Sequence, residues 1–377
     1  MSNNTSTNAS LLEFGGFTVP AGCRRIFITA ELGPSSGDPR IQPTGFPDIG
    51  PVLYPDPSGQ QGLICLIESE ASMANRLEEV CLADKYTGTL KPALKGLPYI
   101  KLTENGQDDG VFKTSSTIDG HRFASEYIIG AKGRFTGAGT DAQMSAYQAP
   151  AAENKEMVEL VKARLGMPAG DSCPAANVPE IFRLAMEYDP LSLIHGFQIS
   201  VKNKLTFVGL RSPRALTASI VGLNCERVSV PGIRFDPIGT GDAGQAIFQK
   251  QRITAKTIEA RFSIDVGLLA SLRLDTLKNG NPGQLQSARF QLLLAIALWK
   301  VAAFLDLLRI ELSLRSECKL RLKDKSEPHY KAEGGASPAS GDFRYPAMAA
   351  ELFTGKDGLI THAQLPADQS PLVLTFA

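Results

Sequence analysis

The chain has 377 residues, enough to bury a substantial core in one large domain or two medium ones. Its hydrophobic content of 43% and charged content of 21% are ordinary for a globular protein. Lysine plus arginine and aspartate plus glutamate each number 39, and this neutral balance argues against indiscriminate binding of nucleic acid.

The basic residues are unevenly distributed along the chain. Residues 200–325 contain 20 of the 39 basic residues and only 10 of the 39 acidic ones, so the remainder is acidic. A basic half suits a polyanion, and a basic half beside an acidic half suits head-to-tail stacking of identical subunits. Chance variation between two solvated surfaces is the simpler alternative.

Cysteine spacing and the apolar segments indicate the cellular setting. The six cysteines form no CxxC pair, so neither a zinc site nor a disulfide framework is indicated, and a reducing cytoplasm is expected. The polar N-terminus MSNNTSTNAS lacks a signal-peptide core. The most apolar stretch, 290–308, contains Lys300 and Asp306, which favours a buried helix over a membrane span.

The first elements follow from hydrophobic periodicity. Residues 25–32 alternate and predict a strand, whereas 33–62 is rich in glycine and proline and predicts a loop. The apolar run 63–67 predicts a buried strand. Residues 68–79 then follow a helical period, with Met73, Leu77, Val80 and Cys81 on one stripe.

The middle of the chain is punctuated by turn residues. We expect an inserted arm at 87–117, a flexible glycine-rich segment at 125–147, a surface helix at 151–165 and a linker at 168–179. Residues 189–201 predict a short strand in which His195, Phe197, Ile199 and Val201 share a face, with 205–210 as its hairpin partner.

The last third combines extended and helical patterns. Residues 214–229 are extended, 231–251 form a long loop and 258–265 alternate as a strand. A long helix is expected at 285–312 and an alternating strand at 314–323, followed by partial disorder at 324–343. The element order indicates an α+β fold with an antiparallel sheet and large insertions.

Six sequence motifs, spread over Arg24 to Lys325, resemble one family. In chain order they are RIQPTGFPDIG (40–50), SMANRLE (72–78), TSSTIDGHRFASEYI (114–128), DPLSLIHG (189–196), LRSPRALTASI (210–220) and IEARFSID (258–265). The chain resembles the backbone subunit, a Cas-seven-type member of the RAMP superfamily, of the type I-U (I-G) CRISPR surveillance complex, Cascade.

This resemblance implies a fold and a domain plan. The expected fold is an RRM-like, ferredoxin-like palm with an antiparallel sheet and large inserted fingers and thumb. The plan is a flexible N-terminus at 1–20, a palm at 21–325, and a partly flexible C-terminal extension at 326–377. The insertions are the loop 33–62, the arm 87–117, a finger region at 130–180 and a candidate thumb at 230–254, with 88–117 as the competing thumb.

Several cationic and small polar residues are candidates for contact with an RNA backbone. A helix start attracts phosphate, a Gly/Pro loop lets the backbone approach a strand, and a rigid proline turn presents two guanidiniums together. A salt bridge or a solvated charge is the simpler explanation for each arginine alone. The predicted RNA-binding residues are Arg40, Gln42, Ser69, Ser72, Asn75, Arg76, His121, Arg122, Arg211, Arg214, Lys250 and Arg252. Phe46 and Phe248 could stack on bases, and packing at a subunit contact is the alternative.

Catalytic signatures are weak. The histidines His121, His195, His329 and His362 belong to no recognised metal motif, and neither GxSxG nor HExxH occurs. The enzymatic alternative is a metal-independent endoribonuclease that processes CRISPR RNA, with His121 as acid or base and Arg122 stabilising the phosphorane. No metal or nucleotide cofactor is indicated.

The resemblance therefore implies a non-catalytic scaffold. Copies would polymerise head-to-tail along one CRISPR RNA and expose its bases to a target DNA strand, so that base pairing supplies specificity. Further implied partners are a fused cap-and-processing subunit, a large subunit that reads the protospacer-adjacent motif (PAM), and a recruited helicase-nuclease. No membrane partner is expected.

Overall fold

The computed structural model describes the chain from residue 10 to residue 376 with internal gaps. The described ranges are 10–14, 17–46, 50–133, 155–166, 178–199, 210–234, 246–275, 284–314, 318–324, 326–335, 339–344, 350–354, 356–365 and 370–376. The fold is mixed α+β with largely antiparallel sheets, as the sequence pattern predicts.

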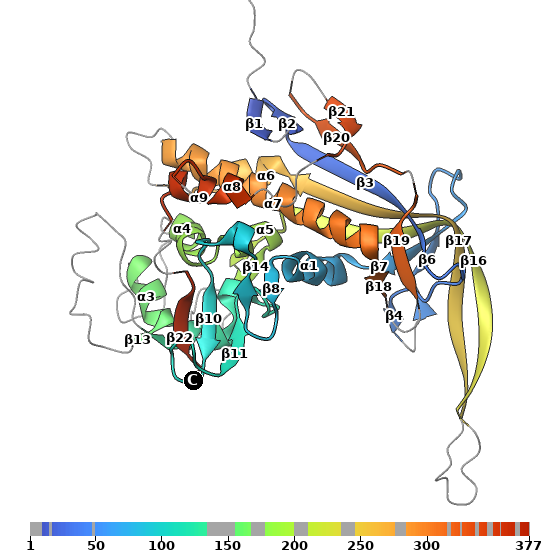
Figure 1. The fold of residues 1–377 in the computed structure, drawn as a ribbon, viewed down its shortest axis with the longest axis horizontal. Coiled ribbons are helices and arrows are strands. Elements are labelled where there is room, and N and C mark those ends of the chain that lie inside the picture. The colour runs from blue at the N-terminus through green and yellow to red at the C-terminus, as the bar shows by residue number, and fades with distance from the viewer. Residues whose placement is uncertain are drawn as a thin grey trace, which may run out of the picture.

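The main sheet has nine described strands (Figure 1). The hydrogen-bonded path runs β18-β19-β3-β17-β16-β7-β6, and the hairpin β20–β21 joins the outer edge of β3. These strands are β3 (Arg25–Pro34), β6 (Leu53–Pro55), β7 (Leu63–Glu68), β16 (Leu216–Arg234), β17 (Ala246–Asp265), β18 (Leu312–Ser313), β19 (Lys319–Leu322), β20 (His329–Glu333) and β21 (Ala339–Asp342).

One face of this sheet is covered by two helices. Helix α1 (Glu70–Glu79) begins where Ser69 caps it, because the Ser69 side chain accepts a hydrogen bond from the Ser72 N–H. Its predicted stripe, Met73, Leu77, Val80 and Cys81, is buried. Helix α7 (Gln284–Ile310) packs against β17 and β19. Alternate residues of β3, including Ile26 and Ile28, face these helices and complete the core.

The apolar helix lies in the interior. The segment Leu285–Ile310 is long and apolar enough to cross a membrane, but 83% of its most apolar window is buried inside the protein. The prediction of a buried helix is therefore confirmed. It is longer than a typical core helix because it spans the main sheet and also contacts α1, α5 (Pro190–His195), α6 (Val266–Ser271) and α9 (Leu359–His362).

Residues 87–117, the expected inserted arm, contribute two strands to a second sheet. Strands β11-β10-β22-β12-β13 form five strands in that order, with β10 and β22 parallel. Their bounds are β10 (Ile100–Thr103), β11 (Phe112–Ser115), β12 (Lys132–Gly133), β13 (Lys155–Glu156) and β22 (Leu372–Thr375). The segment 87–117 is thus a layer of the fold, and the C-terminal segment supplies its central strand.

The remaining described elements surround these two sheets. The helices are α2 (Glu126–Ile129), α3 (Met157–Arg164), α4 (Val178–Tyr188), α8 (Ala350–Phe353), η1 (Pro92–Leu94) and η2 (Arg122–Ala124). Short hairpins are formed by β1 (Ser10–Phe14) with β2 (Phe17–Pro20), β4 (Gly45–Phe46) with β5 (Gly50–Pro51), β8 (Leu82–Asp84) with β9 (Thr89–Leu90), and β14 (Phe197–Ile199) with β15 (Leu210–Ser212).

Several predicted segments differ from the structure. Residues 190–195 form helix α5, so His195 ends a helix and does not share a strand with Phe197; Pro190 at the first helical turn favours this. Strand β14 pairs with Leu210–Ser212; of the predicted partner 205–210, Leu210 lies opposite Ile199, and 205–209 lie outside the described residues. Within the N-terminus, expected to be flexible, β1 pairs with β2, and within 324–343, expected to be partly disordered, β20 pairs with β21. Of the expected flexible segment 125–147, the part that the structure describes contains α2 and β12, and 134–147 lie outside the described residues. Of the expected linker 168–179, residues 178 and 179 begin α4, and 168–177 lie outside the described residues.

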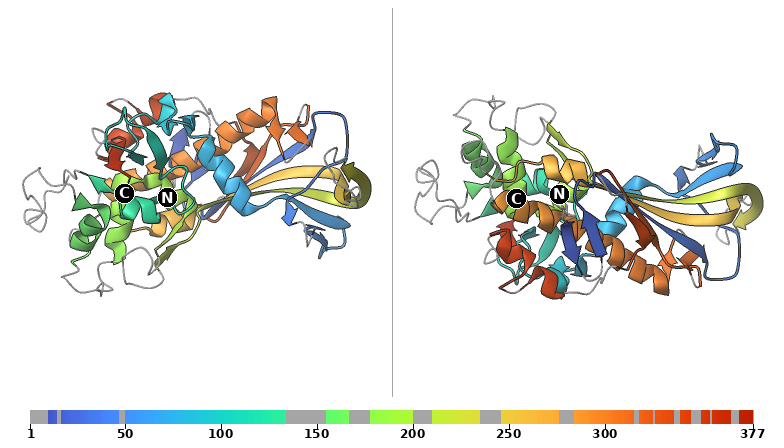
Figure 2. Two further views of the ribbon diagram at one scale, coloured as in Figure 1. Left: turned by 90° about the horizontal axis from the view of Figure 1, so that it is seen from below. Right: turned by 90° about the horizontal axis from the view of Figure 1, so that it is seen from above.

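The expected long loop at 231–251 is largely a two-stranded ribbon. Strands β16 and β17 pair out to Arg234 and Ala246, with one interruption at Asn224. We call residues Cys225–Arg234 and Ala246–Ala255 the ribbon, because they lie past the last pair between β16 and β7 and project from the molecule (Figure 1). Figure 2 places it at the end opposite the second sheet.

The packing of α8 on α7 can be tested with the single tryptophan. Trp299 and Phe353 are both fully buried and meet edge to face, with ring centroids 6.3 Å apart. Phe353→Ala is expected to lower the free energy of unfolding by about 3–5 kcal/mol, because it opens a cavity beside Trp299. Urea unfolding followed by Trp299 fluorescence measures this. The exposed Tyr86→Ala change is the control, and an equal effect of both would contradict the packing.

Candidate nucleic-acid interface

The start of helix α1 has the expected cap but not the expected free arginine. Ser69 and Ser72 are half-buried and bonded to each other through the cap, while Asn75 is exposed. The Arg76 Nη2 donates to Glu68 Oε1 at 2.8 Å and to the Ser313 carbonyl at 3.3 Å. Because Glu68 is buried, this ion pair ties α1 to the end of β7 and to β18, and it neutralises the cation nearest the helix start.

A second group of predicted residues meets at the base of the ribbon. Ile41 and Ile253 exchange backbone hydrogen bonds of 2.8 and 2.9 Å, although they lie far apart in the sequence. This bridge brings Arg40 and Gln42 beside Arg252. The Oε1 atom of Gln42 is buried and has no hydrogen-bond partner within the described part of the chain. A buried acceptor without a partner is unusual, because buried polar groups in folded proteins are normally hydrogen-bonded.

Asp38 lowers the positive charge of this group. Its carboxylate accepts a bidentate hydrogen bond from the Arg40 guanidinium, with N···O distances of 2.9 and 2.8 Å. These bonds, with a contribution from the charge of Arg252, lower the pKa of Asp38 to about 2. The carboxylate is therefore ionised at neutral pH, and the group of Asp38, Arg40 and Arg252 carries one net positive charge.

Arg211 and Arg214 lie at the other end of strand β16. Both are exposed, and Arg211 Nη2 donates to Gln198 Oε1 at 3.1 Å across the β14–β15 hairpin. From Leu216, just after Arg214, to Val228, which pairs with Arg252, the strand spans about 40 Å at ~3.3 Å per residue. The predicted residues therefore form separate groups and not one compact patch.

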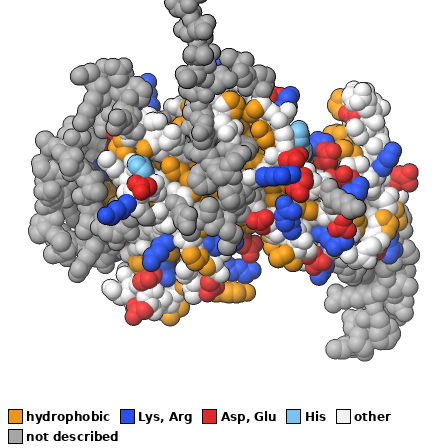
Figure 3. Space-filling view, turned by 45° about the horizontal axis from the view of Figure 1, so that its top comes forward, with side chains coloured by type: hydrophobic (Ala, Val, Ile, Leu, Met, Phe, Trp, Pro, Cys, Tyr) orange, Lys and Arg blue, Asp and Glu red, His pale blue; other side chains and the backbone are white. Residues whose placement is uncertain are grey.

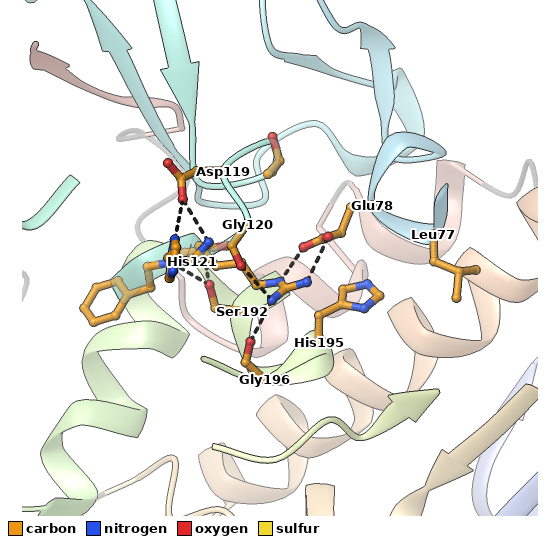
Figure 4. Close-up of polar contacts among 12 residues, drawn as sticks. Leu77, Glu78, Asp119, Gly120, His121, Ser192, His195 and Gly196 are labelled. Atoms are coloured by element: carbon orange, nitrogen blue, oxygen red, sulfur yellow. Dashed lines mark hydrogen bonds and ion pairs between the residues drawn. The ribbon is translucent and has the colours of Figure 1, made fainter. Parts of the chain in front are cut away.

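Arg122 has a structural role. Its guanidinium is buried and pairs with Glu78 of α1 at 2.5 and 3.0 Å, and it also donates to the carbonyls of Gly120 and Gly196 (Figure 4). These contacts tie α1 to the segment before η2 and to the end of α5. We therefore remove Arg122 from the candidate RNA contacts. The neighbouring His121 is 82% exposed, with its Nδ1 3.7 Å from Asp119 Oδ1.

A buried polar network beside Arg122 was not predicted. His195 Nε2 lies 2.8 Å from Lys300 Nζ, and both side chains are fully buried. Burial, with the charges of Lys300, Arg122 and Arg214, holds the pKa of His195 well below its ordinary value, so its imidazole is neutral. Ser192 donates to Asp189, whose pKa burial raises to about 7. A lysine inside the apolar pattern of 285–312 was the signal that a buried partner was needed.

The surface mixes both signs of charge. On the face drawn in Figure 3, acidic and basic side chains alternate and do not gather into one basic patch. Among the described residues, charged side chains pair across strands, as in Arg25–Asp265 and Lys323–Glu31, and along a single strand, as in Arg261–Glu259. Among the residues that the structure describes, no group of three or more His, Cys, Asp or Glu residues could hold a metal ion.

Some predicted residues cannot be placed by their side chains. The backbone of Lys250 pairs with Val230 in the ribbon, next to the Arg252–Val228 pair, and its side chain lies outside the described atoms, as do those of Phe46 and Phe248.

The Arg122–Glu78 pair predicts a specific stability effect. Arg122→Met leaves the buried Glu78 carboxylate without a counter-charge and is expected to cost about 3–5 kcal/mol of unfolding free energy. The double variant Arg122→Met with Glu78→Leu removes both charges and should recover most of that loss. The exposed His121→Ala change is the control, expected within about 0.5 kcal/mol of the unchanged protein. Urea unfolding measures all three, and additive losses in the double variant would contradict the pairing.

Asp189 predicts a pH dependence of stability. Its folded-state pKa of about 7 lies above the ordinary value of 3.8, so the folded protein retains a proton that the unfolded chain has released. This group therefore contributes stability at low pH that disappears as the pH rises through about 7. Asp189→Asn cannot ionise, and its melting temperature relative to the unchanged protein should rise between pH 5 and pH 8. Parallel pH profiles for the two proteins would contradict this.

The chain was compared with known proteins. The model of the family "CRISPR-associated protein GSU0053" matches residues 26–227, more than half of the chain. A chain in a solved structure described as "CRISPR RNA-guided surveillance complex, pre-nicking" aligns with 81% of this chain and 75% of its own length, at 14% identity and a TM-score of 0.35, too weak a likeness to carry an argument. No curated protein matches the sequence. On the strength of the family match, which spans β3, α1 and the first half of β16, the chain belongs to the CRISPR-associated protein GSU0053 family, a Cas-seven-type group.

Proposed function

We propose that this protein is a non-catalytic subunit that binds CRISPR RNA and forms the backbone of a type I antiviral surveillance complex. Membership of a CRISPR-associated family supports a role in a CRISPR complex. The observation that carries the RNA-binding role is the base of the ribbon, where the Ile41–Ile253 bridge gathers Arg40, Gln42 and Arg252 beside a projecting two-stranded element.

The connectivity of the main sheet supports an RRM-like palm. Its central unit is β3-α1-β16-β17-α7-β19 in chain order, and the strands lie in the spatial order β19-β3-β17-β16. Numbering these strands one to four along the chain gives the order 4-1-3-2, with all neighbours antiparallel, which is the arrangement of a ferredoxin-like fold. The additional edge strands and the second sheet are insertions around this unit.

The ribbon is the best candidate for the thumb. Single-stranded RNA can be held without sequence readout by cations and N–H donors along its backbone, with the bases left accessible. A ribbon that projects from the palm, with Lys250 and Arg252 near its base, suits contact with such a strand. The competing thumb candidate, 88–117, contributes β9, η1, β10 and β11 to the body, and its β10 and β11 form part of the second sheet.

The proposed RNA contacts fall into three groups by their place in the fold. In the first group, Arg40, Gln42 and Arg252 lie at the base of the ribbon, and the backbone of Lys250 lies two residues before Arg252 on β17. The second group, at the start of α1, is Ser69, Ser72, Asn75 and Arg76, in which Arg76 pairs with Glu68. The exposed residues His121, Arg211 and Arg214 form a third group at the opposite end of β16.

The wider assembly belongs to the same proposal. Copies of the chain would stack head-to-tail in the cytoplasm on one guide, which pairs with target DNA, together with a fused cap-and-processing subunit, a large subunit and a recruited helicase-nuclease. The mixed surface charges support contact between copies, because opposite charges can meet across such an interface. The type I-U (I-G) subtype rests on the six sequence motifs.

An endoribonuclease is the alternative, and one observation favours it. His121 is highly exposed and lies near Asp119, so it could reach a phosphodiester. Incubating the purified protein with repeat RNA in the presence of a chelator separates the two functions. Intact RNA is expected, and cleavage that His121→Ala abolishes would replace the binding role with the catalytic one.

Guide binding itself provides the main test. The double variant Arg40→Ala with Arg252→Ala is expected to weaken binding of guide RNA about equally for unrelated guide sequences, because phosphate contacts carry no sequence information. The slope of log affinity against log salt should decrease by about 0.7 for each phosphate that the variant no longer neutralises. Filter binding over a salt series measures both quantities.

A matched control separates local contact from net charge. Arg344→Ala with Arg309→Ala removes the same charge from exposed sites that pair with Asp342 and with Asp306 and Glu327. Equal weakening in the two double variants would show that only total charge matters, and unchanged binding in the first would refute the assignment of the ribbon base.

A further inference from the structure

Asn224 marks the point at which β16 leaves the main sheet. At Ile220–Gly222, β16 pairs with β17 on one side and with β7 on the other, and beyond Gly222 it pairs with β17 alone. Among the described residues of β16, Asn224 is the one that has no pairing partner in β17. The ribbon thus begins at an interruption of the strand ladder.

The backbone of Asn224 has an unusual conformation for a strand. Its φ angle is +51°, in the left-handed region that most side chains avoid and that asparagine tolerates better than other non-glycine residues. A single left-handed residue redirects an extended chain. The two-stranded pair changes direction where it leaves the sheet (Figure 1).

This conformation is held from outside the strand pair. The Asn224 N–H donates to the Gln61 carbonyl at 2.8 Å, and its Nδ2 donates to Gln61 Oε1 at 3.2 Å. Gly62 follows with a φ of +59°, and a Cβ atom there would lie 3.1 Å from Asn224 Oδ1. Glycine at position 62 therefore permits the close approach of the two segments.

The turn that carries Gln61 is itself rigidly organised. The Asp56 carboxylate accepts from the N–H groups of Ser58, Gln60 and Gln61, at 3.1, 3.1 and 2.8 Å. The Asp56 N–H donates to the Gly62 carbonyl at 2.8 Å and closes the turn. The hydrogen bonds to Ser58, with those from Gln60 and Gln61, lower the pKa of Asp56, so the carboxylate is ionised and keeps the turn closed at neutral pH.

The second strand of the ribbon is held on its own side. Ile253 of β17 makes the two-way backbone bridge to Ile41 described above, and Thr44 continues the same segment to β7 through a 2.8 Å bond to the Ile67 carbonyl. We call residues 38–44 and 56–62 the collar, since the first holds β17 and the second holds β16 at the base of the ribbon.

We infer that the collar fixes the direction of the ribbon, and that Asn224 and Gln61 are positioning residues for RNA contact. A two-stranded ribbon is marginally stable alone and would swing about its base without such support. A fixed direction makes the ribbon meet the guide at a constant distance from the palm of its own subunit. This inference rests on the proposed RNA-binding function, and it assigns a role to a segment, 33–62, that carries little regular secondary structure.

The physical part of the inference can be tested without RNA. Asn224→Val disfavours the left-handed conformation and removes the side-chain hydrogen bond from Nδ2 to Gln61 Oε1. Amide hydrogen exchange should therefore become about tenfold faster or more in 225–234 and 246–253. Exchange in 220–222 should stay unchanged, because those residues remain paired with both β7 and β17. Thr217→Val, a similar change on β16 inside the sheet, is the control. An unchanged exchange pattern in the ribbon of Asn224→Val would overturn the inference.

Two milder variants keep the test interpretable if Asn224→Val does not fold. Asn224→Gly permits the φ angle but removes the side-chain bond, and Gln61→Ala removes the acceptor Oε1 but retains the backbone carbonyl. Each is expected to accelerate exchange in the ribbon by a smaller factor, about twofold to fivefold. Exchange equal to that of the unchanged protein in both variants would show that the side-chain bond has no positioning role.

The functional part is tested by nuclease footprinting of guide RNA saturated with protein. The unchanged protein should protect segments of uniform length, whereas Asn224→Val should give irregular lengths with affinity per subunit reduced no more than about threefold, because the charged contacts remain. Uniform protection in a variant whose ribbon exchanges rapidly would overturn the positioning role. Failure of the unchanged protein to bind guide would overturn the proposed function instead, and the exchange experiment would still report on the collar.

Discussion

The pairing of β16 with β17 is the constraint on which the rest of the structure depends. The same two strands form the centre of the main sheet at one end and the projecting ribbon at the other. Within the sheet, alternate residues such as Ile220, Ala260 and Phe262 are buried against α1 and α7, which anchors the pair. The ribbon can therefore project without a core of its own, because its register is set by the buried half of the same strands.

The two sheets are joined by buried polar groups as well as by apolar packing. Glu78 of α1, Arg122 before α2 and Lys300 of α7 lie among the apolar residues that fill the space between the sheets. Buried charges are stabilising only when their partners are correctly placed, so a relative shift of the two parts would leave a charge unpaired. The network therefore contributes more to fixing one relative position of the two sheets than to net stability.

The distribution of charge explains how a neutral protein can suit a polyanion. Most arginines near the sheet pair with carboxylates, as Arg76 does with Glu68 and Arg25 with Asp265. Such pairing limits indiscriminate attraction to nucleic acid, since nearby opposite charges cancel beyond about 10 Å at ordinary ionic strength. Under the proposed function, selective contact with RNA depends on a few local positions such as the ribbon base, where Arg40 and Arg252 lie near Asp38.

Much of the fold was predictable because its signals are local. The alternation of 25–32, the stripe of α1 and the apolar run of α7 all follow from residues a few positions apart, and all three elements are confirmed. His195 was misplaced because its alternation with Phe197 and Ile199 also fits the last residue of a helix followed by a strand. The ribbon was predicted as a loop because Pro231, Gly232 and the glycines after them are turn residues in isolation.

The sequence by itself determined the family, the periodic elements and the set of residues able to contact phosphate. Only the tertiary structure decided which of those residues remain available. Arg122 and Glu78 are 44 positions apart, and Asn224 and Gln61 are 163 apart, so neither contact has a local signature. The identity of a side chain determines what it can bind. Its actual partner depends on which segments the folded chain brings side by side.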